Sequence, residues 1–296
     1  MYMGNSENAM RDYDSTWEDE VGYEDSTQFS TQWSWSAQRN IAAARDMQNY
    51  RRKCRNVYNG TDHDMEDEDV SLNLLFYQNK IPFNFDGMRI EDFHMNWFGN
   101  YERLEHVHCY IQWLFPIHEK GMNASCRLSS KAIKLFRRDE EMKKKLLVSY
   151  KLMLDFYGIQ LVSEETGEVK RAVNWKERFA NLNRNTHNNL RITRILKCLG
   201  LLGFQHYQEP LVHFFLVETL VRGTLPRVKQ SVLDYFMFAV VDKSKRKELI
   251  KFALCYFEPK EEFVWCPRRI QIKFLKEVER AQKETEIPKV KKWNTG

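Results

Sequence analysis

The sequence predicts an all-α fold, in which several helices form a single globular bundle with at most one small hairpin. Two observations favour this class. Apolar residues recur at spacings of three and four through much of residues 71–284, and this is the period of an amphipathic helix. Hydrophobic residues make up 43% of the chain and aromatic residues 14%, which is enough for a sizeable core. No period of 20–50 residues relates these segments, so a solenoid of sequence repeats is not predicted.

The chain is expected to begin and end outside the folded domain. Residues 1–35 are acidic and almost lack aliphatic side chains, so we expect a disordered tail. Aromatic residues are unusual in such a tail and indicate docking, either on a partner or on the basic domain of the same chain. They are Trp17, Phe29, Trp33 and Trp35. The helical domain is expected at 36–284, and residues 285–296 are expected to form a flexible basic tail.

The domain divides into an N-terminal helix at 36–58, an acidic linker at 59–70 and the main bundle at 71–284. Ser36 is expected to cap the first helix. The stretch 159–173 alternates and contains a Thr-Gly turn, so it is expected to form a small hairpin or a loop. Pro226 suits the first turn of a helix. Further helices are expected at 90–98, 100–115, 129–136, 139–157, 208–222, 226–241, 243–257 and 268–284.

The stretch 172–203 holds the helix around which the bundle is expected to form. Its apolar stripe consists of Ile192, Ile195, Leu196, Leu199 and Leu202. Asn185 or Thr186 is expected to cap the start of this helix, and Gly200 and Gly203 are expected to end it. The other side is basic, and two interpretations stay open: a solvated face of a core helix, or a surface that binds phosphate or an acidic partner. The residues of this basic face are Arg184, His187, Arg191, Arg194 and Lys197.

Charge is distributed unevenly along the chain. Residues 1–70 carry a net charge of −8, whereas residues 71–296 carry +13. The asymmetry predicts either an anionic partner or an acidic tail that screens the basic domain, although ordinary solubility charge explains it equally well. A basic cluster is also typical of a nuclear-import segment, which would make import factors partners. It consists of Arg51, Arg52, Lys53 and Arg55.

Three features of the sequence indicate an intracellular protein: no membrane segment, no signal peptide and scattered cysteines. No run of 18 apolar residues is present, so no transmembrane segment is predicted, and the N-terminus does not resemble a signal peptide. The six cysteines include no CxxC pair, and in a chain of this length they are expected to be reduced thiols without disulfides.

The sequence contains no pattern of residues that is typical of a catalytic or metal site. His106 and His108 are two residues apart, so a helix would direct them to different faces, and the HExxH pattern of helical zinc sites is absent. The glycine patterns of P-loop, dinucleotide-binding and α/β-hydrolase folds are also absent. The sequence therefore predicts a non-enzymatic protein without a metal or other cofactor.

Aromatic residues are the second set of candidates for a binding site. Most of them must form core, and the remainder are available to line a groove for a short peptide. Trp175 lies four residues before Phe179 on a helix that Asn174 is expected to cap, and their shared face is expected to pack on the central helix. As a core residue, Trp175 would leave a cavity when replaced by alanine, at a cost of ~3–5 kcal/mol, whereas a ligand role would affect binding alone. The candidates are Trp97, Tyr101, Trp113 and Trp175.

Four blocks carry a family resemblance. They are AVNWKERFANLNRNTHNNLRITRILKCLGLLG at 172–203, LLFYQNKIPFNFDG at 74–87, YIQWLFPIHEKGMN at 110–123 and SVLDYFMFAV at 231–240. In this order they resemble the opioid growth factor receptor family, and the resemblance covers residues 36–267. The segment DSTWEDE at 14–20 is more similar to the receptor proper than to the receptor-like paralogue. The repetitive C-terminal tail of many vertebrate members is absent from this sequence, so functions of that tail are not expected of it.

The resemblance implies a non-enzymatic intracellular receptor that binds the opioid pentapeptide Met-enkephalin and restrains cell proliferation. It also implies a nuclear or perinuclear and cytoplasmic location. The residues themselves leave two alternatives open. The basic face of the central helix is also typical of a protein that binds nucleic acid, and equally of a scaffold on which the acidic tail folds back.

Overall fold

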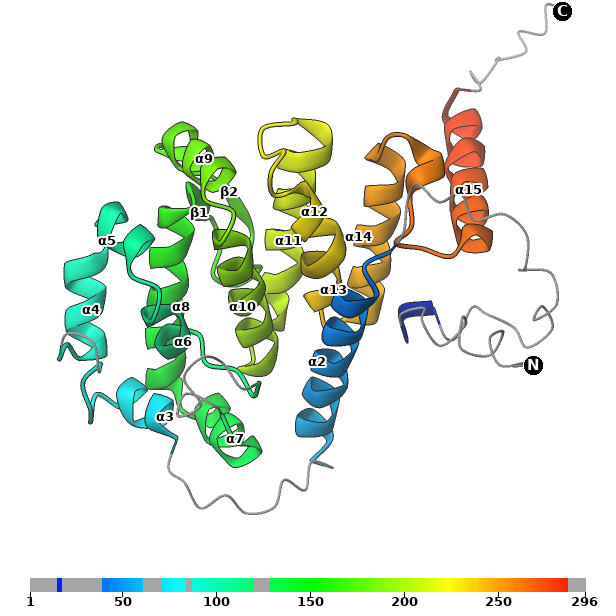
Figure 1. Cartoon of the computed structure of the whole chain (residues 1–296). Coiled ribbons are helices and arrows are strands. Elements are labelled where there is room, and N and C mark those ends of the chain that lie inside the picture. The colour runs from blue at the N-terminus through cyan, green and yellow to red at the C-terminus, as the bar shows by residue number, and fades with distance from the viewer. Residues whose placement is uncertain (1–14, 18–38, 61–70, 84–86, 120–127, 287–296) are drawn as a thin grey trace, which may run out of the picture.

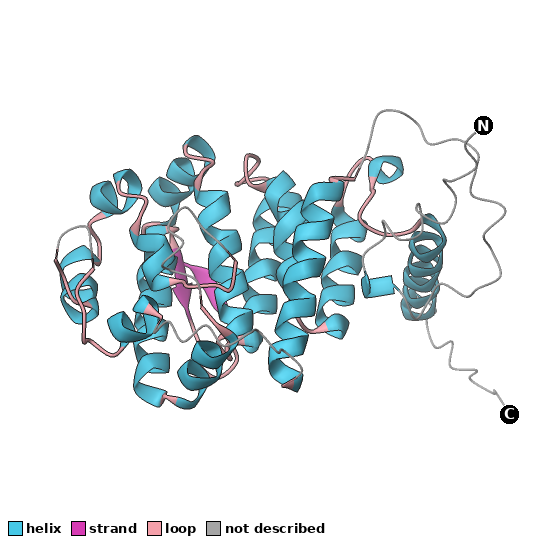
Figure 2. Ribbon diagram, turned by 60° about the horizontal axis from the view of Figure 1, so that its bottom comes forward, coloured by secondary structure: helices cyan, strands magenta, loops and turns pink. Residues whose placement is uncertain are grey.

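The structure is a computed structural model, and it describes residues 15–17, 39–60, 71–83, 87–119 and 128–286. Its helices run side by side across the molecule, as Figures 1 and 2 show from two directions. The all-α prediction is confirmed, and the one small hairpin is the only sheet in the described residues. From one end of the molecule to the other, the principal helices are α4 (Ile90–Trp97), α8 (Glu140–Phe156), α10 (Asn188–Leu201), α14 (Lys243–Tyr256) and α15 (Arg268–Glu286).

The N-terminal helix α2 (Ile41–Asn59) begins five residues later than predicted. Asn40 caps it, because its side-chain oxygen accepts a hydrogen bond from the backbone N–H of Ala43 at 3.0 Å. Ser36 lies outside the described residues. The helix is part of the bundle: Met47 and Cys54 are fully buried, and α2 packs against α10 and α13 (Met237–Ala239).

The predicted helix at 100–115 is wrong as a single element. The chain forms α5 (Tyr101–His106) and α6 (Tyr110–Leu114), with extended backbone at Val107, where φ is −87° and ψ is 131°. The guanidinium of Arg191 donates hydrogen bonds to the carbonyl oxygens of Leu104 and Val107, at 2.9 and 3.0 Å. This distant side chain therefore replaces the N–H groups that a continuous helix would supply.

The helices predicted at 129–136 and 139–157 are both present. The side chain of Ser129 caps α7 (Ser130–Arg138), and that of Asp139 caps α8 through the N–H groups of its first turn. Gly158 ends α8 with a φ of 77°, in the left-handed region that favours glycine. Of the two alternatives expected for 159–173, a hairpin or a loop, the structure has the hairpin, formed by antiparallel pairing of two short strands, β1 (Ile159–Leu161) and β2 (Val169–Arg171) (Figure 2).

The second half of the chain contains two segments of π-helix, which sequence periodicity did not predict. Pro226 lies in a turn before α12 and not in the first turn of a helix, so that prediction is corrected. The elements of this half, besides those already given, are α9 (Trp175–Arg184), η3 (Gln205–Tyr207), α11 (Gln208–Leu216), the π-helix η4 (Val217–Val221), α12 (Lys229–Ser231), the π-helix η5 (Val232–Phe236) and η6 (Lys260–Glu262). Two short pieces complete the described elements, α3 (Leu72–Tyr77) and η1 (Ser15–Trp17).

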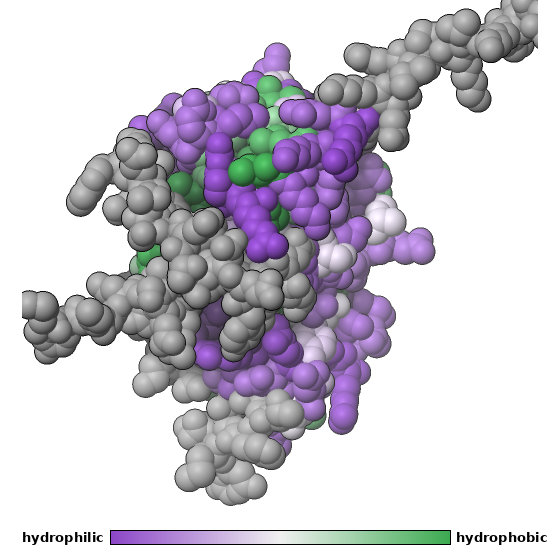
Figure 3. Space-filling model, turned by 90° about the vertical axis from the view of Figure 1, so that its right-hand side faces the viewer, coloured by the Kyte–Doolittle hydropathy of each residue, from purple (hydrophilic) through white to green (hydrophobic). Residues whose placement is uncertain are grey.

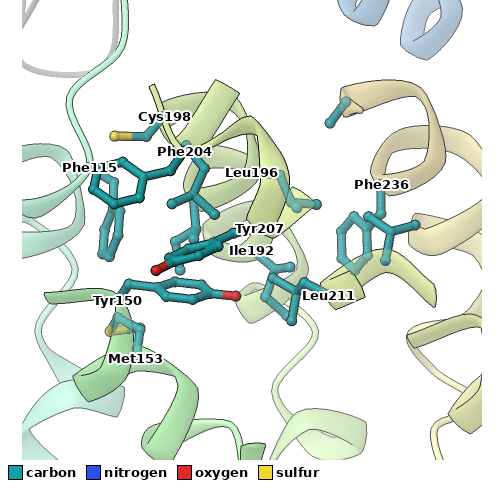
Figure 4. Packing of buried hydrophobic residues seen from close by; sticks show 14 of the residues in the cluster. Phe115, Tyr150, Met153, Ile192, Leu196, Cys198, Phe204, Tyr207, Leu211 and Phe236 are labelled. Atoms are coloured by element: carbon teal, nitrogen blue, oxygen red, sulfur yellow. The ribbon is translucent and has the colours of Figure 1, made fainter. Parts of the chain in front are cut away.

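One continuous hydrophobic core joins these helices. Figure 4 shows its middle, where the rings of Tyr150 from α8 and Tyr207 stack with centroids 5.4 Å apart. Ile192 and Leu196 of α10 reach the same region and are at most 1% exposed. The predicted apolar stripe of α10 is therefore confirmed as core.

Trp175 lies at the edge of this core, against which it packs as a partly buried residue, and whether its face reaches α10 stays a prediction. Its side chain is half-buried, with the guanidinium of Arg171 3.9 Å from its ring and the ring of Phe179 at 5.4 Å. Phe179 in turn contacts Phe214 of α11 at 6.3 Å. Asn174 stands at the cap position without a capping bond, because its amide donates to Tyr101 and Asp155.

We expect Trp175→Ala to lower the free energy of unfolding by only about 1–2 kcal/mol, because a half-buried ring leaves little cavity and loses mainly its contact with a cation. Trp175→Phe, which keeps a ring beneath Arg171, should retain more than half of that stability. Urea denaturation of both variants measures the difference. A loss above about 3 kcal/mol would restore the interpretation of Trp175 as a core residue.

Candidate functional site

The basic side chains of α10 that the sequence placed on an outer face are directed into the protein. Arg191 is only 5% exposed and binds the end of α5 as described above, and its guanidinium also donates a hydrogen bond to Nδ1 of His108 at 2.7 Å. Arg194 is half-buried and donates through Nε to the carbonyl of Phe115 at 2.8 Å. These two residues fasten α10 to the segment that follows α4.

Lys197 does the same on the side of α2. It is 3% exposed, and its Nζ lies 3.0 Å from Asp46 Oδ1 and 2.8 Å from Glu119 Oε1. A buried ammonium is stable only with such partners, since desolvation of an unpaired charge is costly. The interpretation of a solvated basic face is therefore corrected for Arg191 and Lys197.

The remaining two basic candidates are more accessible. Arg184 is exposed at the end of α9, and the side chain of His187 is 39% exposed with Nε2 2.5 Å from Glu105 Oε1. Burial raises the pKa of Glu105, but hydrogen bonds from Asn181 and Asn188 outweigh it and hold the pKa below its usual range. His187 occupies the cap position of α10 without a capping bond, so neither Asn185 nor Thr186 caps this helix.

The aromatic candidates are distributed through the core and do not form one site. Trp97 stacks on Phe93 at 4.4 Å, and Trp113 is 2% exposed. Tyr101 is half-buried and donates to Asp155 Oδ2 at 2.7 Å. Whether any of these residues binds a ligand stays a prediction, but the side chains are engaged within the protein and the accessible hollow lies elsewhere.

That hollow is a groove of about 570 Å³ between α11, α14 and α15. Its size is within the range of small-ligand sites, roughly 300–1,000 Å³. Figure 3 views the molecule from the α15 end and shows apolar side chains gathered in a patch that hydrophilic ones surround. The lining residues used below are Glu209, His213, Glu248, Lys251, Phe252, Cys255, Tyr256, Leu275 and Val278.

Three aromatic rings form a continuous row in the groove. His213 meets Phe252 edge to face at 4.7 Å, and Phe252 contacts Tyr256 at 4.6 Å. The side chain of Tyr256 is 48% exposed, so part of its ring is accessible to a ligand in the groove. The row offers flat apolar surface to a ligand with aromatic or aliphatic side chains.

The groove also carries charges of both signs. The carboxylates of Glu209 and Glu248 suit an ammonium group, whereas the Lys251 ammonium suits a carboxylate. Lys251 Nζ lies 3.7 Å from Glu277 Oε2, and with both side chains partly exposed this pair is weak enough for an anionic ligand to replace. The arrangement therefore fits a short zwitterionic peptide with apolar side chains.

Sequence reasoning missed this site. Phe252 and Tyr256 are one turn apart on α14, and they lie beside the buried stripe that contains Leu249 and Ala253. A helix that carries aromatic residues outside its core stripe was the available signal. The α11 and α15 walls could not be assigned without the tertiary structure.

Residues 66–271 match the family model described as the opioid growth factor receptor conserved region. The chain belongs to the opioid growth factor receptor family. The matched region contains α11 and α14, so two walls of the groove lie within it. The α15 wall and Ser15–Trp17 lie outside it.

Relatives carry both names of the family. The chain is 52% identical over 231 residues to the opioid growth factor receptor of Mus musculus, and this alignment covers 78% of the chain and 36% of the relative. The identity to the Homo sapiens receptor is 49%, and that alignment covers 78% of the chain and 33% of the relative. For opioid growth factor receptor-like protein 1 of Rattus norvegicus it is 44% over 260 residues, covering 88% and 54%. The chain thus spans between about a third and a half of these relatives' lengths. No solved structure matches the chain.

Three further observations concern only the part of the chain that the structure describes. No described helix is long and apolar enough to span a membrane. The five cysteines in the described part of the chain are free thiols, and Cys126 lies outside it. Within the described ranges no cluster of His, Cys, Asp or Glu has the arrangement of a metal site.

Proposed function

We propose that this member of the opioid growth factor receptor family is a non-enzymatic receptor module that binds Met-enkephalin in the groove between α11, α14 and α15. The observation that carries the proposal is a hollow in which an aromatic row lies between carboxylates and an ammonium. Family membership supports the class of protein, and the resemblance supplies the peptide.

The chemistry of the peptide matches the groove end by end. Its N-terminal tyrosine has a free ammonium, which Glu209 or Glu248 would bind, and its C-terminal carboxylate would pair with Lys251. Its aromatic and terminal apolar side chains would lie against Phe252 and Tyr256. The two glycines of the peptide let its backbone follow a narrow surface.

The expected result is saturable heat when Met-enkephalin is titrated into the full chain, and a Kd raised by about tenfold or more in Phe252→Ala, since a central aromatic anchor carries much of the binding energy. Glu248→Gln should raise the Kd by less, because it removes one charge at an exposed position. Isothermal calorimetry measures both. Absence of heat at about 50 μM protein would contradict direct binding.

Two matched controls locate the binding. Phe98→Ala removes an aromatic side chain that is 56% exposed next to α4, far from the groove, and should leave the Kd unchanged. Bound peptide should also slow the alkylation of Cys255, which lines the groove, but not that of the exposed Cys109. Equal protection of both thiols, or none at Cys255, would place the peptide elsewhere.

We also propose that the protein acts in the nucleus, the perinuclear region and the cytoplasm, where it restrains proliferation. The resemblance supports this role, and Arg52 and Arg55 on α2 are exposed to an import factor, whereas Arg51 is buried and donates to the Phe238 carbonyl. A fluorescent fusion with both exposed arginines replaced by alanine should lose nuclear signal.

Cells carrying Phe252→Ala should no longer slow their growth in response to the peptide. An unchanged growth response in these cells would show that growth restraint does not depend on the groove.

A further inference from the structure

A short piece of the acidic N-terminal tail is seated on the same two helices that form the groove. Trp17 of η1 is 1% exposed, with its ring 6.0 Å from that of Phe274 on α15 and the Lys247 ammonium of α14 at 5.8 Å. Thr16 is fully buried, and its hydroxyl accepts a hydrogen bond from Arg246 Nε at 2.7 Å. This tripeptide therefore contacts α14 and α15 at once.

The seat of Trp17 and the groove share one helix–helix contact. Lys251 lines the groove and also lies 5.4 Å from the ring of Phe274, the residue on which Trp17 packs. Leu275 and Val278, neighbours of Phe274 on α15, form the groove wall. Phe274, Leu275 and Val278 of α15 are only half-buried even with Trp17 in place, whereas Ile270 at the start of the helix is buried. Removal of Trp17 would therefore expose much of what holds α15 against α14.

Two features indicate that the tail can detach. The indole N–H of Trp17 is buried but meets no acceptor among the described residues, so seating the ring leaves a polar group unsatisfied. The sequence around the tripeptide is acidic, at Asp14 and at 18–20, whereas the start of α14 is basic. Attraction between charges of opposite sign is weakened by salt, and least for a buried group such as Arg246. The basic residues at the start of α14 are Lys243, Lys245, Arg246 and Lys247.

We propose that Ser15–Trp17 is a detachable intramolecular latch, which holds α15 against α14 and so maintains the α15 wall of the groove. Of the acidic tail only Ser15–Trp17 is described, so the hypothesis that the tail folds onto the face at 184–197 stays a prediction. With the latch seated, the groove has all three walls. With the latch released, α15 loosens and the groove loses the wall formed by Leu275 and Val278.

Hydrogen exchange on the full chain tests the latch without any ligand. Trp17→Ala should raise amide exchange in residues 268–280 by about tenfold or more while α8 and α10 stay protected, since only a local opening becomes easier. Trp17→Phe should show a smaller rise, and Phe98→Ala none. Raising salt to about 0.5 M should raise amide exchange in residues 268–280 of the wild type towards the level of Trp17→Ala. Unchanged exchange in α15 would overturn the proposal, and so would a rise throughout the domain, which would make Trp17 ordinary core.

The effect on the groove rests on the proposed function, and calorimetry tests it separately. If Met-enkephalin binds the wild type, Trp17→Ala should raise its Kd by about fivefold or more, because the binding-competent arrangement becomes less populated. Equal Kd values for the wild type and Trp17→Ala would show that the latch does not affect peptide binding in the groove. If the wild type binds no peptide, the proposed function fails, and the exchange of α15 still decides whether the latch exists.

Discussion

Gly200→Ala is expected to lower the free energy of unfolding by about 3 kcal/mol or more, because overpacking and the loss of buried hydrogen bonds each cost ~1–3 kcal/mol. A Cβ at this position would lie 2.0 Å from Tyr50 Oη and 2.6 Å from Gln208 Nε2. Both groups belong to a buried network: Gln208 Nε2 donates to the Leu196 and Ala239 carbonyls, at 2.9 and 2.8 Å. Chemical denaturation measures the loss, which is a large share of the ~5–15 kcal/mol of a typical domain.

A double-mutant cycle identifies the cause. Tyr50→Phe removes the hydroxyl that the new methyl group would strike, so the double variant with Gly200→Ala should be more stable than the two separate losses predict. Strict additivity would mean that this contact is not what excludes alanine. A loss below about 0.5 kcal/mol for Gly200→Ala would contradict the close packing of α2 on α10.

Glu218→Ala is expected to cost about 3 kcal/mol, because breaking a buried ion pair leaves its partners without compensation. The Glu218 side chain is fully buried in η4, where its carboxylate accepts from Arg171 at 2.8 and 2.5 Å, from Arg222 at 2.6 Å and from Thr224 at 2.6 Å. Arg171 belongs to β2, so this carboxylate fastens the hairpin to the end of α11. Arg222→Ala, which alters a half-exposed partner, should cost less than about 1 kcal/mol.

The pH dependence of stability gives a second measurement of the same group. Burial raises the pKa of Glu218, but hydrogen bonds from Arg171, Thr224 and Arg222 outweigh it, so the pKa lies below its usual range. A carboxylate with a lowered folded-state pKa stabilises the fold above the unfolded-state value of about 4.3 and loses this contribution as pH falls through the folded-state pKa. The stability gap between wild type and Glu218→Gln should therefore narrow below about pH 4. A constant gap from pH 7 to pH 3 would show that Glu218 acts by packing alone.

Local sequence was sufficient for most helices, whereas it left a hairpin and a loop both open at 159–173. Ser129 and Asp139 cap α7 and α8 through their own side chains, and Gly158 ends α8 in a left-handed conformation. These signals work because a capping bond or a positive φ depends on residues only a few positions apart. The apolar stripe of α10 also follows from spacing alone, since the residues on one face of a helix must be buried together.

Contacts with residues far away in the sequence determined the structure at the positions where local signals predicted the wrong element. Val107 lies within a helical pattern, yet the chain breaks there because Arg191, more than eighty residues away, binds the preceding carbonyls. Gly200 resembles a helix terminator in sequence, but it lies inside α10 and is needed for the approach of Tyr50. Neither contact leaves a trace in the neighbouring residues.

The sequence by itself determined the fold class, the family and the core face of α10, because these depend on composition, on motif order and on the helical period. It did not determine the role of the α10 basic row, since a cation at a given helical position is solvated or buried according to what packs above it, and here Asp46 and Glu119 cover Lys197. Tertiary structure alone placed Phe252 beside His213 to form the groove, and seated Trp17 on Phe274. Both contacts join segments far apart in the chain, and spacing along a sequence carries no information about which faces of separate helices will meet.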